Sequence, residues 1–236
     1  MLAVTPRSLG GNRLPLAVSA LFLCLVAFAF VGPYLLGVGK PPPARVPPIL
    51  VLHGLAMGGW VGLLAVQSSL VRLRRVTWHR RLGWFGSGWA LVTVTMGCTA
   101  TIFAAHRDVQ AHKPWAHIKV GIMLLECTQM LLFLGCIVLA VLWRRRPDRH
   151  QRFMILTALC MWPSVVGRFP GIDSAPAIMT GLDVALVALL VADAIRNRRV
   201  HPVYLWGCLT IAAVMHLVYV VALSPWWASV SMPLLS

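Results

Sequence analysis

Long apolar stretches constrain the fold of this chain more than any motif does. A transmembrane helix needs roughly 20 mostly apolar residues to cross ~30 Å of hydrocarbon. Hydrophobic residues make up 59% of the 236 residues, the mean hydropathy is +0.80, and only 11% of the residues are charged. This composition predicts an all-α transmembrane bundle of about seven spans, forming one integral membrane domain over residues 1–236. We expect the spans at residues 15–36, 47–71, 83–105, 116–143, 153–170, 175–195 and 202–223.

Positive residues collect in alternate gaps between these stretches, and this asymmetry predicts the orientation. Loops rich in Lys and Arg stay on the cytoplasmic side, so the N-terminus is expected inside and the C-terminus outside. The first span is expected to be a retained helix, because no A-x-A-like cleavage site follows it. The richer gaps hold Arg7, Arg13, Arg72, Arg74, Arg75, Arg80, Arg81, Arg144, Arg145, Arg146, Arg149, Arg152, Arg196, Arg198 and Arg199, and the opposite gaps hold Lys40, Arg45, Arg107 and Lys113.

The net charge of +15 is therefore a topology signal, and it favours contact with anionic lipid headgroups at the cytoplasmic face. Nucleic-acid binding is excluded, because no basic soluble domain is present to carry it. A His beside arginines opens three of the cytoplasmic helix ends. The interpretation that we favour is anchoring near lipid phosphate, and the alternative is an anionic ligand at a helix N-terminus. These motifs contain His79, Arg80, Arg81, His150, Arg152 and His201.

Small residues and cysteines inside the spans carry structural signals. Gly54, Gly58 and Gly62 are spaced four apart, which predicts a close helix–helix contact. Pro163 predicts a kink in the fifth span. The six cysteines all lie inside spans without a C-x-x-C motif, so we interpret them as small buried hydrophobes and expect neither a disulfide nor a thiolate metal site.

Ionisable residues inside the spans are the main functional signal, because such groups are costly in hydrocarbon and face an interior or a site. At a rise of ~1.5 Å per residue, His53 and His216 both lie ~9 Å from the outer boundary. The sequence therefore predicts a pocket in the outer half of the membrane, with His117 at its mouth. Its candidate members are His53, His117, Arg168, Asp183 and His216, whereas Lys119 and Glu126 share a face of the fourth span and Glu126 lies near the midplane.

Several chemistries fit these residues. The leading hypothesis is a redox-associated pocket for one haem b, with His53 and His216 as axial ligands, or His53 with His117. A quinone pocket is an equal form of it, in which Asp183 and a histidine exchange protons with the ring oxygens. Arg168 and Asp183 would orient the ligands in either case.

Three further functions remain open. Glu126 and Asp183 suit a proton or cation path in a transporter. His53 and Met57, four apart on one helix face, suit Cu(I), and an assembly factor that hands on a metal or haem is a related possibility. A purely structural role, such as an ion pair of Arg168 with Asp183, competes with all of these hypotheses. A retinal protein is excluded, since residues 202–223 contain no lysine.

Four blocks of residues resemble a family of bacterial inner-membrane proteins of unknown function. The resemblance covers about residues 50–220 and implies a multi-pass protein of the bacterial cytoplasmic membrane, without an activity to transfer. A more distant likeness is to small proteins around respiratory oxidases and to b-type cytochromes, which implies a respiratory-chain partner. The blocks are His53 with Gln67, then His79-Arg80-Arg81-Leu82-Gly83-Trp84, then His150-x-Arg152-Phe153-Met154 with Arg168, then Arg198-Arg199-x-His201-Pro202.

Overall fold

The computed structural model describes residues 14–35, 46–169, 171–172 and 174–236, with side chains described to residue 30 in the first of these ranges. Four helices start on a proline, whose fixed φ and missing N–H suit the first helical turn. The described helices are α1 (Leu14–Leu35), α2 (Pro48–Arg72), α3 (Val76–Gln110), α4 (Ala116–Leu142), α5 (Pro147–Cys160), α6 (Trp162–Val166), α7 (Ala175–Asn197), α8 (Pro202–Ala222) and α9 (Pro225–Leu235).

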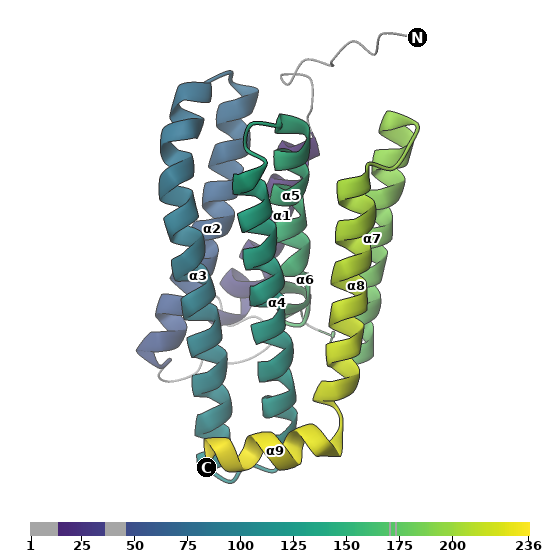
Figure 1. Cartoon of the computed structure of the whole chain (residues 1–236). Helices are drawn as coiled ribbons and strands as arrows, with labels where there is room; N and C mark the ends of the chain where they lie inside the picture. Colours follow the sequence, from purple (N-terminus) through teal and green to yellow (C-terminus); the bar gives the residue numbers. More distant parts are fainter. Residues whose placement is uncertain (1–13, 36–45, 170, 173) are drawn as a thin grey trace.

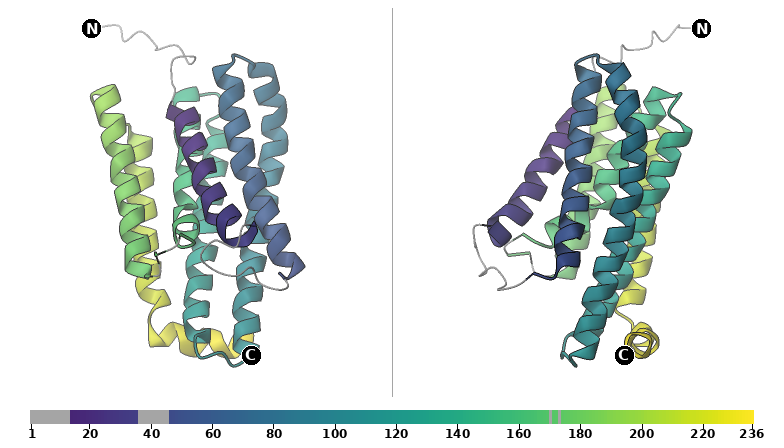
Figure 2. Two further views of the ribbon diagram at one scale, coloured as in Figure 1. Left: turned by 180° about the vertical axis from the view of Figure 1, so that it is seen from behind. Right: turned by 90° about the vertical axis from the view of Figure 1, so that its left-hand side faces the viewer.

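The helices form an up-and-down bundle in which α4 is central (Figure 1). Helix α4 packs against α3, α5 and α8, while α1 and α3 flank α2 and α7 packs mainly on α8. The core between them is apolar and well ordered around Trp60 and Phe133, whose rings meet edge to face at 5.0 Å. Figure 2 shows that α1 is inclined to the other long helices at the edge of the bundle.

The outside of the bundle is also apolar, and this identifies its solvent as lipid. Leu55, Leu131 and Leu217 are each more than 60% exposed, on three different helices. A contiguous exposed apolar surface of this kind marks a membrane protein, because water would penalise it. Five helices are long and apolar enough to cross a membrane, namely α2, α3, α4, α7 and α8.

The predicted count of seven spans is not confirmed. The described apolar part of α1 covers only Leu14–Phe30. The single fifth span predicted over 153–170 is wrong as one helix, because the chain forms α5 and α6 with a break at Met161. Pro163 in the first turn of α6 lacks the N–H that would continue α5, so the predicted kink is confirmed as a break.

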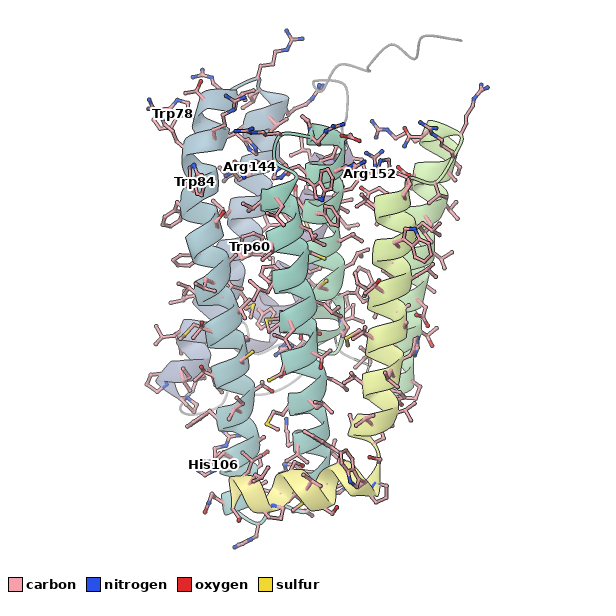
Figure 3. The ribbon with its side chains drawn as sticks, in the orientation of Figure 1. Trp60, Trp78, Trp84, His106, Arg144 and Arg152 are labelled. Atoms are coloured by element: carbon pink, nitrogen blue, oxygen red, sulfur yellow. The ribbon has the colours of Figure 1, made fainter. Side chains whose placement is uncertain are left out.

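The arginine-rich turns all lie at one end of the bundle. The α2–α3, α4–α5 and α7–α8 turns are at the upper end in Figure 1, and Figure 3 labels Arg144 and Arg152 there with Trp78 and Trp84. The Arg144 guanidinium lies 5.8 Å from the centre of the Trp84 ring and that of Arg81 lies 5.7 Å from the Trp78 ring. The arginine-rich gaps of the sequence therefore come together at one end of the folded bundle. Arg7, Arg13, Lys40 and Arg45 lie outside the described residues.

Helix α9 lies across the opposite end of the bundle, beneath α3 and α4 (Figure 1). Ser224 caps it by accepting a hydrogen bond from the Trp227 N–H at 3.2 Å. Trp227 Nε1 then donates to the Val120 carbonyl at 2.9 Å, and His106 Nδ1 donates to the Leu235 carbonyl at 2.8 Å. The predicted spans end at residue 223 and do not include this helix, although a Ser-Pro pair is a recognisable helix start.

Glycines make a close helix contact, but not where the sequence predicted it. A Cβ added at Gly54, Gly58 or Gly62 would meet no described atom within 4 Å. The close contact lies between α4 and α8, where a Cβ on Gly121 would come within 2.6 Å of the Ala222 carbonyl oxygen. Spacing on one helix does not determine which face the partner helix covers, and the prediction for α2 is therefore wrong for the described residues.

Candidate functional site

A cavity of about 50 Å³ lies between α1, α2, α4 and the α5–α6 break, in the half of the bundle that the sequence analysis predicts to face outwards. Phe22, Val26 and Phe30 form its wall on α1, at four-residue spacing. Three of the predicted site residues line the same cavity, namely His53, Glu126 and Arg168. The break between α5 and α6 makes this possible, because it brings Arg168 back towards α4 at the depth of Glu126.

Charged and polar groups line one side of the cavity. Arg168 Nη2 lies 4.0 Å from Glu126 Oε1, and both side chains are about three-tenths exposed. The other guanidinium nitrogen of Arg168 donates to the Ser164 carbonyl, while the Ser164 hydroxyl accepts from Gln129. The Arg168 guanidinium also lies 5.0 Å from the centre of the Phe30 ring. The two opposite charges compensate each other, so this side of the cavity is polar without a large net charge.

His53 faces this pair from α2. Its Nδ1 is buried and has no hydrogen-bond partner among the described residues. The charges of both Arg168 and Glu126 act on its imidazole. A buried ring nitrogen without a partner is costly, and such atoms in native proteins call for an explanation, for example a bound ion or a ligand.

Sulfur atoms line the rest of the cavity. Met57 follows His53 by one helical turn, and Met130 and Met161 enter from α4 and the α5–α6 break. A Cβ on Gly97 would lie 2.7 Å from Met130 Sδ and 2.8 Å from Met57 Cε. The ends of both methionines therefore rest on the bare backbone of Gly97, and any larger residue there would push them apart.

His216 and Asp183 form a second, separate group between α7 and α8. His216 Nε2 lies 3.0 Å from both carboxylate oxygens of Asp183. Both side chains are more than two-fifths exposed and neither lines the cavity. The structure thus confirms neither His53–His216 nor His53–His117 as a pair around one ligand, and His117 is itself exposed at the start of α4.

The geometry gives no support to haem or quinone in this cavity. Among the described residues, His53 is the only histidine in its lining, and no group of three His, Cys, Asp or Glu side chains is arranged to hold a metal. Pockets for larger organic ligands have volumes of ~300–1,000 Å³. A cavity of about 50 Å³ accommodates an ion or a few water molecules, since one water needs ~10–15 Å³.

A buried ionic cluster joins α5, α7 and α8 at the arginine-rich end of the bundle. Asp193 is 1% exposed and lies 3.6 Å from Arg152. Its carboxylate also accepts hydrogen bonds at 2.7 Å from the Asn197 amide and from the backbone N–H of His201. The Arg152 guanidinium lies 5.4 Å from the centre of the Tyr204 ring. Arg152, predicted to anchor the protein at lipid phosphate, instead neutralises a buried carboxylate.

His201 caps α8 at this cluster. Its Nδ1 accepts a hydrogen bond from the Val203 N–H at 3.1 Å, and its Nε2 lies 3.5 Å from Asp148. Burial lowers the pKa of His201 below its usual value, and the Arg152 charge lowers that pKa further, against the opposing effect of Asp148 and Asp193. A neutral ring with its proton on Nε2 can accept from the Val203 N–H through Nδ1 and donate to Asp148 through Nε2 at the same time.

His79 and His150 meet at the N-terminal ends of α3 and α5. Their ring centroids are 6.1 Å apart. His150 Nδ1 donates to the Ala140 carbonyl at 2.8 Å, and the Gln67 amide, in the orientation that satisfies both of its ends, donates to His79 Nδ1 at 2.6 Å. Both histidines therefore bond within the bundle, whereas Arg81 stacks on Trp78 at the rim.

The sequence analysis missed several residues that matter in the structure. Met130, Met161 and Gly97 were not considered, because apolar residues in an apolar span give no contrast. Asp193 was missed although it lies inside the predicted span 175–195. A single carboxylate between small apolar residues, close to an Arg-rich helix end, was the available signal.

Searches against protein-family models, curated proteins and solved structures found no match for this chain.

Proposed function

We propose that this protein binds a soft monovalent metal ion, Cu(I), in the outer-half cavity, and that it handles copper within the membrane. The proposed setting is the bacterial cytoplasmic membrane suggested by the sequence resemblance. The proposed topology has seven crossings, with α1 and the α5–α6 pair added to the five long apolar helices. Support for an inward N-terminus comes from the arginine-rich turns at one end of the bundle.

One observation carries the proposal: Met57 and Met130 meet over Gly97 in a cavity that His53 also lines, and the buried Nδ1 of His53 has no hydrogen-bond partner among the described residues. Thioether sulfur and imidazole nitrogen are ligands that favour Cu(I) over harder cations. Two methionines and one histidine supply three neutral donors from two helices. Met161 lines the same cavity and is a further sulfur donor.

The electrostatics of the cavity allow a monovalent cation. Arg168 would repel a metal ion if it were unpaired, but Glu126 lies beside it and offsets its charge. A cation bound by neutral ligands in a low-dielectric site depends on such compensation. We therefore assign Glu126 to charge balance, and we assign to Arg168 the role of holding Glu126 and the α6 end in place.

The competing ligands of the sequence analysis have less support. The haem hypothesis paired His53 with a second axial histidine, and no other histidine lines the cavity among the described residues. Both haem and quinone also exceed the volume of the cavity. The proton-path hypothesis requires Glu126 and Asp183 to act in series, but Asp183 pairs with His216 on another part of the bundle. A small soft ion is the ligand class that matches both the donors and the volume.

The test is Cu(I) titration of the purified full-length protein under anaerobic, reducing conditions against a chromophoric Cu(I) chelator. The triple variant His53→Ala, Met57→Leu, Met130→Leu should lose one equivalent of Cu(I) relative to wild type. Met57→Leu alone should weaken that equivalent by ~10-fold or more, as losses around metal ligands do. Leucine keeps the volume and removes only the sulfur, so the fold should be retained.

Met179→Leu is the matched control, because Met179 is 6% exposed in α7 and does not line the cavity. It should bind as many equivalents as wild type. An unchanged Cu(I) stoichiometry in the folded triple variant would overturn the proposal. A haem Soret band from the purified protein, or saturable binding of a short-chain quinone that requires His53, would overturn it in favour of the redox pocket.

A further inference from the structure

Two cysteines face each other beside the cavity, on its cytoplasmic side. Cys136 Sγ of α4 lies 4.0 Å from Cys160 Sγ at the end of α5. Cys160 is 2% exposed and directly precedes Met161, a residue of the cavity lining. Along α4, Cys136 lies six residues beyond Met130 towards the cytoplasmic end, which is a rise of ~9 Å.

We infer that Cys136 and Cys160 form a second Cu(I) site. The membrane interior would then hold two neighbouring Cu(I) sites with soft ligands. This inference rests on the proposed function and extends it from binding towards transfer across the membrane. The sequence analysis interpreted these cysteines as small hydrophobes, because the pairing of α4 with α5 is not visible in their spacing.

The separation of the two sulfurs suits one bridging metal ion. Two metal–sulfur bonds of ~2.3 Å place the sulfurs ~3.8 Å apart at a tetrahedral angle and ~4.6 Å apart when collinear. The observed 4.0 Å lies between these limits. A disulfide would need the sulfurs ~2.05 Å apart. Both side chains therefore need only small movements to hold an ion, whereas a disulfide would need a larger one.

The binding step balances without a redox partner. One thiol gives up its proton to become a thiolate, the other donates a sulfur lone pair, and the ion is Cu(I) before and after binding. The bound group is then neutral, and one proton is released for each ion bound. Neutrality favours this protonation state, since a buried group with net charge is costly in the membrane interior.

The positions of the sulfur side chains also indicate a direction for transfer of the ion across the membrane. Met130, a donor of the cavity, lies on the same helix as Cys136. Met161, another donor of the cavity, is next in sequence to Cys160. A third thiol, Cys208 of α8, is buried near this pair. Sulfur side chains therefore extend from the outer-half cavity towards the cytoplasmic half of the bundle.

The test counts Cu(I) ions per chain by elemental analysis after equilibration with a Cu(I)-buffered chelator. Wild type should retain two equivalents, Cys136→Ser with Cys160→Ser should retain one, and the cavity triple variant should also retain one. The two proposals fail separately: loss only in the cavity variant overturns the cysteine site, and loss only in the cysteine variant overturns the cavity site. Silver ion, titrated in parallel, should give the same counts because it has no redox chemistry here.

The matched control is Cys98→Ser with Cys127→Ser, a second thiol pair whose side chains interact between α3 and α4. This variant should retain two equivalents. Equal losses in both cysteine pairs would overturn the assignment to Cys136 and Cys160. Sulfur-only coordination by X-ray absorption in the cavity triple variant would support it independently, and nitrogen or oxygen ligation there would contradict it.

Discussion

At the scale of single residues, Asp193 in the buried ionic cluster at the arginine-rich end is a position where a substitution is expected to be costly. Asp193 is the buried partner of three donors, and its removal leaves the Arg152 guanidinium, which is 12% exposed, without a counter-charge. Breaking a buried pair by deleting one partner costs about 3–5 kcal/mol. We predict that Asp193→Asn lowers the unfolding midpoint of the detergent-solubilised protein by an amount in keeping with that loss.

The control for this prediction is Asp183→Asn. Asp183 also pairs with a basic residue, but both side chains are more than two-fifths exposed. Exposed pairs contribute only ~0–1 kcal/mol, so the midpoint should hardly move. Equal shifts of the unfolding midpoint in the two variants would show that burial does not make the Asp193 ion pair contribute more to stability than the Asp183 pair.

The cap at His201 predicts a pH dependence on the acidic side of neutrality. The pKa of His201 is lowered mainly by burial and next by Arg152, against Asp148 and Asp193. A lowered folded-state pKa means that the stabilisation is complete above about pH 6.5 and is lost as the pH falls towards the lowered value. Protonation of Nδ1 would also remove the acceptor that caps Val203.

The measurement is the unfolding midpoint at about pH 7.5 and about pH 5.5. His201→Asn keeps a capping side chain that does not titrate, so its midpoint should fall less than that of wild type between the two pH values. An identical fall in the variant would exclude His201 as the titrating group.

At the scale of the helices, one backbone contact fixes how α4 and α8 cross. Gly121 has no room for a Cβ, because the Ala222 carbonyl oxygen lies in its place. Gly121→Ala should separate the two helices and destabilise the protein by about 1–3 kcal/mol, the usual cost of overpacking. Thermal unfolding monitored by the fluorescence of a fused reporter measures this effect.

Gly135 provides the comparison within the same helix. A Cβ there would meet no described atom within 4 Å, and Ala favours a helix over Gly by ~1 kcal/mol. Gly135→Ala is therefore expected to keep or raise the midpoint. A similar destabilisation at both glycines would contradict the contact between α4 and α8.

At the scale of the whole molecule, the arginine-rich end and the helix count together predict the topology. With seven crossings and an inward N-terminus, the C-terminus lies outside. Alkaline phosphatase fused after Ser236 should be active, and a fluorescent protein that matures only in the cytoplasm should stay dark there. The reverse pair of results would place the arginine-rich end outside, because α8 leads from that end to the C-terminus at the opposite end of the bundle, and it would overturn the proposed orientation.

Much of this architecture was available from the order of the residues. Apolar length, proline at helix starts and the distribution of arginine are local properties, and they correctly predicted a multi-pass helical membrane protein and the break at Pro163. They also placed His53 and Arg168 together in the outer half, since depth follows from position along a span, but they placed Glu126 nearer the midplane and did not group it with them. The seven-span count exceeds the five long apolar helices that the structure supports.

Only the tertiary structure decided which residues at one depth meet. His53 and His216 have matching depths, but one faces the cavity and the other pairs with Asp183 between α7 and α8. The rotation of each helix about its axis is set by packing against its neighbours, and the spans are apolar on all sides, so the sequence does not reveal it. The same reason explains why Met130 over Gly97, Cys136 beside Cys160, and Asp193 beneath Arg152 became visible only in the folded bundle.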